Sequence, residues 1–147
     1  MDERETTKIA KTIATDCIAI RVRFVNRVIT HLYERALKPL DIKVSQAAIL
    51  VLLSVRGESS PADIGRILQM EKSTVSRNVG RMRKKGWLEV KNRNEGLLQD
   101  IKASSKGRKL LAAFYAKWTK AQKAARELLG EEGITAVRKL YDTLRDR

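Results

Sequence analysis

The segment from residue 60 to residue 103 constrains the fold of this 147-residue chain more than any other part of the sequence. It begins with SPADIGRILQ, in which Ser60 is a good helix N-cap and Pro61 suits the first helical position. A tight turn leads into a second amphipathic stretch over 71–85, which Gly86 ends. The pattern predicts two short helices joined by a tight turn. The apolar line of the second helix consists of Val75, Val79 and Met82.

A β-hairpin is predicted directly after this pair of helices. The segments WLEVKN and LLQDIKA are short and strand-like. Between them, Asn94, Glu95 and Gly96 offer the turn and left-handed conformations that a hairpin requires. Helix, tight turn, helix and hairpin in immediate succession are the plan of a winged helix-turn-helix. In that fold the second helix enters the major groove of DNA and the hairpin is the wing.

A long N-terminal helix is expected from about Thr6 to Leu37, because the residue before Pro39 is pushed out of the α region. It carries two apolar stripes, whereas packing within one domain needs a single stripe. A partner chain is the simplest explanation, and burial of the helix within one chain is the alternative. The stripes consist of Ile13, Cys17, Ile20, Phe24 and Val28, and of Ile18, Val22, Val25, Ile29, Leu32 and Ala36.

Three further helices complete the chain. Ser45 is expected to cap a short buried helix, SQAAILVLLSV. Ser104 or Ser105 is expected to cap a long helix that stops at Gly130, and a last helix is expected over about 131–145.

The predicted fold class is therefore mostly α with a small β-hairpin wing (α+β), in a single domain over 1–147. Within that domain, 45–104 is the expected winged helix-turn-helix lobe that binds DNA. The helices of 1–40 and 105–147 are assigned to dimerisation.

The exposed face of the helix over 71–85 carries the residue types that read DNA. Arg77 and Arg81 lie one turn apart and are long enough for bidentate contact with guanine. Ser73 and Thr74, at the helix start, can donate to phosphate or to bases. The residues predicted to bind DNA are Ser60, Ser73, Thr74, Ser76, Arg77, Arg81, Lys84, Lys85, Lys91 and Arg93.

Gly80 lies on the same face, between the two arginines. Glycine in a helix interior costs roughly 1 kcal/mol relative to alanine, so it needs a reason there. Close approach to DNA and close packing of another helix are both adequate reasons, and the sequence does not choose between them.

Net charge favours a polyanionic partner. The chain carries a formal charge of +14 and has a sequence pI near 10.3. Residues 66–109 hold 13 Lys and Arg against four Asp and Glu, a net of +9. A basic run such as RMRKKG is often only solvated surface, but this one falls on the predicted second helix. Lys84, Lys85 and Lys91 are expected to hold phosphate. The lysine ammonium is a compact charge and cannot make the bidentate contact of an arginine guanidinium.

Other function classes find little support. The run AAILVLL is far shorter than the roughly 20 residues that span a membrane. The acidic start MDERETT argues against a secretory signal, so a cytoplasmic protein is expected. One cysteine and one histidine predict no disulfide framework, no metal site and no cofactor. No nucleophile–base pair or phosphate loop indicates an enzyme. A sequence-specific regulator remains the first choice, with a sequence-tolerant architectural DNA binder as the alternative.

The sequence resembles the MarR family of winged helix-turn-helix bacterial transcription regulators over nearly its whole length. The resemblance is carried by ITHLYERALKPLDIKVSQAAIL, ADIGRILQMEKSTVSRNVGRMRKKGWLEV and IKASSKGRKLL. It implies a homodimer that is joined through the first and last helices and reads a pseudo-palindromic operator in double-stranded DNA. We expect a repressor, with activation left open. The tip KNRNEGLLQD departs from the family pattern of an Asp and one or two Arg, and leaves only Lys91 and Arg93 as basic candidates.

The resemblance also implies release of DNA by a small phenolic or lipophilic effector. Its pocket is expected between the first helix, the helix over 45–55 and the long helix after the hairpin. Phe24, Tyr115 and Trp118 are its candidate lining residues, although aromatic side chains at these positions equally suit a core.

Cys17 and His31 have two interpretations each. Cys17 lies on an apolar stripe and is expected to be a small structural residue, although some relatives sense oxidants through a cysteine in the first helix. His31 shares the helix face of Phe24 and is expected to be an interface residue rather than a metal ligand or a pH sensor.

Overall fold

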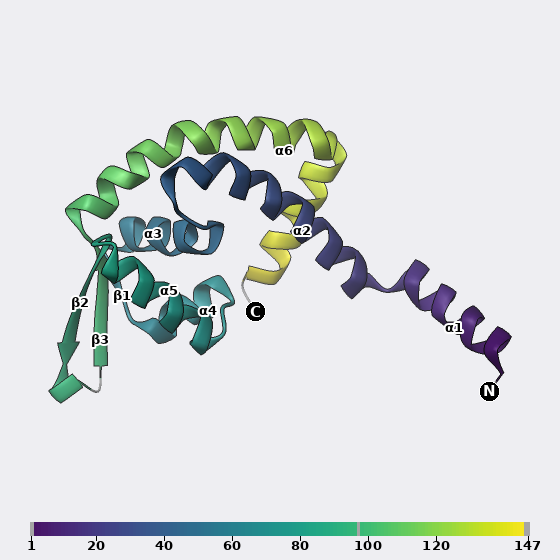
Figure 1. The fold of residues 1–147 in the computed structure, drawn as a ribbon, viewed down its shortest axis with the longest axis horizontal. Helices are drawn as coiled ribbons and strands as arrows, with labels where there is room; N and C mark the ends of the chain where they lie inside the picture. The colour runs from purple at the N-terminus through teal and green to yellow at the C-terminus, as the bar shows by residue number, and fades with distance from the viewer. Residues whose placement is uncertain (1, 97, 146–147) are drawn as a thin grey trace.

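The computed structural model describes residues 2–96 and 98–145, and its elements follow the predicted order (Figure 1). Most of the described chain is helical, and its sheet has three antiparallel strands in the order β1-β3-β2. The predicted fold class is confirmed. The elements are α1 (Glu3–Asp16), α2 (Ile18–Leu37), η1 (Lys38–Leu40), α3 (Val44–Arg56), β1 (Glu58–Ser59), α4 (Pro61–Leu68), α5 (Lys72–Lys84), β2 (Leu88–Arg93), η2 (Asn94–Gly96), β3 (Leu98–Ala103) and α6 (Ser105–Arg145).

The hydrophobic core is built around α3. Leu50 and Leu53 of α3 are fully buried, together with Ile64 of α4, Met82 of α5 and Ile101 of β3. In Figure 1, α2 and the first part of α6 lie on one side of α3, while α4, α5 and the two long strands lie on the other. One core therefore holds the helix-turn-helix and the wing against the flanking helices.

The predicted helix pair is confirmed as α4 and α5. The Ser60 hydroxyl accepts a hydrogen bond from the backbone N–H of Asp63 at 3.1 Å, which caps α4 with Pro61 in its first turn. Gln69 ends α4 in the left-handed conformation (φ 52°), and the chain then turns directly into α5. Gly86 (φ 75°) follows the end of α5, as expected for a helix stop.

The predicted hairpin is present as β2 and β3, which pair antiparallel along their whole length. The turn between them places Asn94, Glu95 and Gly96 at positive φ, as predicted. Sequence analysis missed β1, the third strand, which pairs with β3. A strand of two residues leaves no alternation in the sequence to detect.

The expectation of one continuous N-terminal helix is wrong, because the helix breaks at Cys17 (ψ 110°) into α1 and α2. The guanidinium of Arg21 donates to the backbone carbonyl of Thr15 across the break. No residue of α1 is buried, so no packing within the described residues holds α1 in line with α2. Figure 1 shows α1 extending away from the rest of the molecule. At its other end α2 stops at Leu37, before Pro39, as predicted.

The expected N-cap of α3 is also wrong. The helix begins at Val44, so Ser45 lies inside its first turn. The Glu34 carboxylate accepts from the N–H of Val44 at 2.9 Å, and the side-chain oxygen of Gln46 accepts from the N–H of Lys43 at 3.1 Å. Glu34 belongs to α2, ten residues before Val44. Sequence analysis searched for a cap among the neighbouring residues and therefore missed this one.

The start of α6 forms a close junction with the end of α5 and the start of the wing. Ser104 caps α6, as predicted: its hydroxyl accepts from the N–H of Gly107 at 3.0 Å and donates to the carbonyl of Gly86 at 2.6 Å. A Cβ at Gly107 would lie 2.2 Å from the carbonyl oxygen of Trp87, so only glycine fits. Within α6 the helix is interrupted at Gly130 (φ 65°, ψ 174°), where a stop was predicted, and a second helical part continues to Arg145.

Gly107→Ala should lower the free energy of unfolding by about 1–3 kcal/mol, because the backbone of Trp87 must move to admit the methyl group. Urea denaturation of both proteins measures the difference. Gly80→Ala is the matched control, since open space surrounds Gly80 in α5 and alanine there should add roughly 0.5–1 kcal/mol. A Gly107→Ala protein as stable as the parent would show that the junction is loose.

Candidate nucleic-acid interface

The outer face of α5 is exposed and carries most of its cations. Val75 and Met82 are buried on the inner face, as the predicted apolar line requires. Thr74 is half-buried at the edge, and the guanidinium of Arg77 donates to its hydroxyl at 3.4 Å. The predicted orientation of the helix is therefore confirmed. Its exposed residues include Ser73, Ser76, Arg77, Gly80, Arg81, Arg83 and Lys84.

The open question about Gly80 is settled in part by its surroundings. No heavy atom lies within 4 Å of a Cβ placed on Gly80, apart from its own helix backbone and chain neighbours. No other helix of the described chain packs there, which removes one of the two explanations. Gly80 lowers the outer surface of α5 where another molecule could approach.

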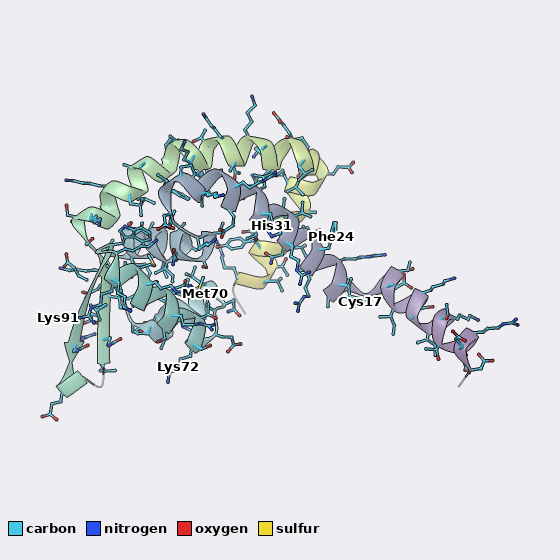
Figure 2. The ribbon with its side chains drawn as sticks, viewed as in Figure 1. Cys17, Phe24, His31, Met70, Lys72 and Lys91 are labelled. Carbon is cyan, nitrogen blue, oxygen red and sulfur yellow. The ribbon has the colours of Figure 1, made fainter. Side chains whose placement is uncertain are left out.

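A groove of about 770 Å³ runs between α4, α5 and the wing. Lys72, Ser76, Gly80 and Arg83 line it from α5, at helical spacings of four, four and three. Sequence analysis did not select Lys72 or Arg83, although this spacing places both on the helix face of Ser76 and could have identified them. Figure 2 shows Lys72 on α5 and Lys91 on the wing. The groove is thus bordered by cations of α5, while the residues that line it from the wing, Val90, Gly96, Leu98 and Gln99, are uncharged.

Ser60 also lines this groove, but its hydroxyl is already engaged at the start of α4. Besides capping the helix, the hydroxyl donates to the carboxylate of Asp63 at 3.0 Å. Hydrogen bonds from Arg66 and then from Ser60 lower the pKa of Asp63, so this carboxylate is ionised at neutral pH. The DNA contact predicted for Ser60 would have to share the hydroxyl with the cap.

The wing carries both signs of charge. Arg93 forms an ion pair with Asp100 on the opposite strand, and Lys102 pairs with Glu89 at 3.0 Å. Lys91 faces Asp100 in the strand register and makes no ion pair among the described residues. Of the two basic candidates at the wing, Lys91 is therefore the better placed to meet a phosphate.

Lys85 differs from its neighbour Lys84, which is exposed. The Lys85 ammonium donates to the backbone carbonyl and to the carboxylate of Asp41, each at 2.6 Å. It also lies 4.4 Å from the ring centroid of Trp87. The hydrogen bond and the charge of Lys85 lower the pKa of Asp41. Lys85 was predicted to contact phosphate, but its ammonium binds Asp41 and the ring of Trp87 instead.

A second pocket, of about 620 Å³, lies between α2, α3 and α6, where an effector site was expected. Tyr115 and Trp118 line it with stacked rings 5.8 Å apart. Phe24, which was also expected to line the pocket, is 69% exposed on α2 and is not among the residues that line it. The full lining is Ile29, Thr30, Tyr33, Leu37, Val44, Ala47, Ala48, Val51, Leu111, Phe114, Tyr115 and Trp118.

Tyr33 is the main polar group of this second pocket. Its hydroxyl donates to the side-chain oxygen of Gln122 on α6. Burial raises the pKa of Tyr33, so the phenol stays neutral around pH 7. The lining contains no charged side chain, which makes the pocket unlike the cationic groove beside α5.

Large apolar side chains remain exposed on α1, α2 and the last part of α6. They include Ile13, Ile18, Ile20, Val22, Phe24, Val25, Val137, Leu140, Tyr141 and Leu144. Both predicted stripes of the N-terminal helix are thus left uncovered at these positions by the chain's own fold. None of the helices in residues 2–96 and 98–145 combines the length and apolarity needed to cross a lipid bilayer.

Cys17 and His31 belong to this N-terminal region (Figure 2). Cys17 is half-buried at the break between α1 and α2, and His31 is exposed on α2. Within the described residues, no group of three or more His, Cys, Asp or Glu side chains is arranged to hold a metal ion.

We compared the chain with protein families, curated proteins and solved structures. The MarR family model matches residues 40–96, which run from the end of η1 through α5 to the tip of the wing. No curated protein matches the chain in sequence.

Several solved structures share the fold. A mutant of MarR from E. coli in complex with operator DNA is 16% identical, with a TM-score of 0.78 over 90% of this chain and 96% of that one. BpsR of Bordetella bronchiseptica, whose DNA binding is regulated by 6-hydroxynicotinic acid, is 15% identical, with a TM-score of 0.79 over 90% and 96%. The organohalide-sensing regulator RdhR in its ligand-free form is 24% identical, with a TM-score of 0.76 over 99% and 84%.

At these identities the likeness to each structure is one of fold, and it extends beyond the residues that the family model matches. The predicted resemblance is therefore confirmed: residues 40–96 match the MarR family model, and the chain has the winged helix-turn-helix fold of the MarR structures.

Proposed function

We propose that this protein is a homodimeric, sequence-specific DNA-binding transcription regulator that places α5 in the major groove. The observation that carries the proposal is the outer face of α5. This face is exposed, carries cations along its length and has open space above Gly80. A helix of this kind fits the width of the major groove, where arginine reaches base edges. A mutant MarR solved in complex with operator DNA has the same fold, which supports DNA as the partner of this chain.

The residues of α5 divide by position and chemistry. Arg77 and Arg81 lie in the middle of the helix, where a groove-bound helix faces base edges, and their guanidinium groups are suited to guanine. Lys84 lies near the C-terminal end, closer to the phosphates. Lys72 and Arg83 line the groove beside the wing, so they join Lys91 as candidates for backbone contact.

Arg77→Ala should weaken binding to the best operator by about 1–3 kcal/mol and relax preference at one base position. Lys84→Ala should weaken binding to all sequences alike and lower the salt slope by roughly one unit, because one phosphate contact is lost. Operators are first selected from random DNA, and affinity is then measured for both variants on operator and random duplexes across a salt series.

This experiment also tests the proposal itself. Equal affinity of the unmodified protein for operator and random DNA would indicate the architectural alternative, in which phosphate contacts supply all of the binding. If Arg77→Ala weakens the two duplexes equally, Arg77 holds phosphate and base reading must lie elsewhere on α5.

The proposed homodimer is formed by α1, α2 and the last part of α6. Support comes from the large apolar side chains that these helices leave in solvent. A two-fold dimer would present two α5 helices to a pseudo-palindromic operator.

Sedimentation at micromolar concentration should give about twice the 16.7 kDa mass of one chain. Leu140→Glu should shift the equilibrium toward monomer, because a charge would be buried in the interface. Val55→Glu is the control, since Val55 is exposed on α3, outside the proposed interface. A folded monomer at this concentration, or equal effects of both variants, would contradict the assignment.

We further propose that the protein acts as a repressor in the cytoplasm and that an effector releases it from DNA. The pocket between α2, α3 and α6 supports an uncharged, largely apolar effector, because no charged side chain lines it. Such a ligand would bridge the flanking helices and α3, which packs against the helix-turn-helix. The organohalide-sensing regulator of the same fold is compatible with a ligand of this class.

Two probes of similar size and different charge test this proposal. At pH 7, 4-chlorophenol should raise the melting temperature and weaken operator binding, whereas anionic 4-chlorobenzoate should do neither, because its charge would be desolvated. Ala48→Phe, which fills the pocket, should abolish the response to 4-chlorophenol. A stronger response to the anion than to the phenol would contradict the proposed ligand class.

A further inference from the structure

Lys85 lies where three parts of the chain meet. Its backbone follows the last residue of α5, its ammonium group reaches Asp41 after η1, and its side chain covers the ring of Trp87 at the start of the wing. The Lys85 side chain is 34% exposed, while the neighbouring Lys84 is exposed. Two adjacent lysines at the end of the same helix therefore have different surroundings.

Asp41 is held in place by its backbone. It adopts a left-handed conformation (φ 51°), its N–H donates to the carbonyl of Lys38 at 3.1 Å, and the next residue, Ile42, is buried in the core. The Asp41 carboxylate itself is 89% exposed. Its hydrogen bond to the Lys85 ammonium, together with the bond to the Asp41 carbonyl, ties a fixed point of the α2–α3 connection to α5.

Trp87 is fixed as well. Its side chain is buried, its backbone N–H donates to the carbonyl of Met82 at 2.9 Å, and its backbone carbonyl accepts from the N–H of Ser104 at 3.0 Å. The Lys85 ammonium thus has two oxygen acceptors on Asp41 and the aromatic face of Trp87. A phosphate would have to displace these partners before it could bind Lys85.

We propose that Lys85 is a positioning residue that holds the C-terminal end of α5 to the α2–α3 connection, rather than a contact to DNA phosphate. The inference rests on the proposed DNA-binding function. Through Asp41, the angle at which α5 is presented is tied to the connection between the flanking helix α2 and α3. Lys84 holds phosphate, and Lys85 sets the direction of the helix that carries it.

A double-mutant cycle with Asp41→Asn and Lys85→Gln separates the two roles, and Lys84→Gln is the matched control. Asparagine tolerates the left-handed backbone at position 41, so the exchange removes charge without backbone strain. Affinity is measured on a selected operator across a salt series.

Asp41→Asn and Lys85→Gln should each weaken operator binding by about threefold to tenfold. The double variant should be no weaker than either, because one contact is lost in all three. The salt slope should stay unchanged in these variants and fall by roughly one unit in Lys84→Gln. A phosphate contact at Lys85 predicts the reverse: Lys85→Gln would lower the slope, and Asp41→Asn would strengthen binding by releasing the ammonium. That result would overturn the proposal.

Trp87 gives a second readout that needs no DNA. In a Trp118→Phe background, which leaves Trp87 as the only tryptophan, Asp41→Asn and Lys85→Gln should change its fluorescence emission alike, and Lys84→Gln should not. Failure to select any operator would count against the proposed function alone, since this measurement would still report the contact. Unchanged emission in both variants would show that the Lys85 side chain does not hold its place, and would overturn the inference.

Discussion

The arrangement of the DNA-binding elements depends on the close junction of Gly86, Trp87, Ser104 and Gly107. The Ser104 hydroxyl caps α6 and donates to the carbonyl of Gly86, while the Trp87 carbonyl accepts from the N–H of Ser104. The missing side chain of Gly107 lets α6 begin against that carbonyl. These short contacts fix the end of α5, the base of the wing and the start of α6 relative to one another.

The outward face of α5 is available for binding because stability and recognition use opposite sides of the helix. Val75, Val79 and Met82 supply the buried contacts, and the exposed cations contribute little to folding. A net charge of +14 on a small domain opposes the folded state through repulsion, and a polyanion would relieve it. Lys85 is the exception on α5, since its ammonium is occupied by Asp41 and Trp87.

The second pocket is lined by residues of α2, α3 and α6. In Figure 1, α2 and the first part of α6 lie on the other side of α3 from α4 and α5. A molecule bound there would touch α2, α3 and α6 at once, and α3 shares its core with the helix-turn-helix. In the proposed dimer, a shift of α3 would change the separation of the two α5 helices. The contact between Asp41 and Lys85 is a direct physical link along this route, because it joins the α2–α3 connection to the end of α5.

Local features of the sequence determined the helix pair, the hairpin with its turn, the caps at Ser60 and Ser104, and the outward face of α5, because each depends on residues a few positions apart. Tertiary structure alone decided the break at Cys17, the α3 cap from Glu34, the exclusion of Phe24 from the pocket, and the strand β1. It also decided that Arg93 and Lys85 are paired while Lys84 is free of such a partner among the described residues. The Glu34 cap, the strand β1 and the Lys85 contact depend on other elements of the fold, and the Arg93 pair depends on the register of the hairpin. The break at Cys17 lies where no packing among the described residues holds α1 in line with α2. The sequence alone does not show which group a charged or apolar side chain will contact in the folded protein.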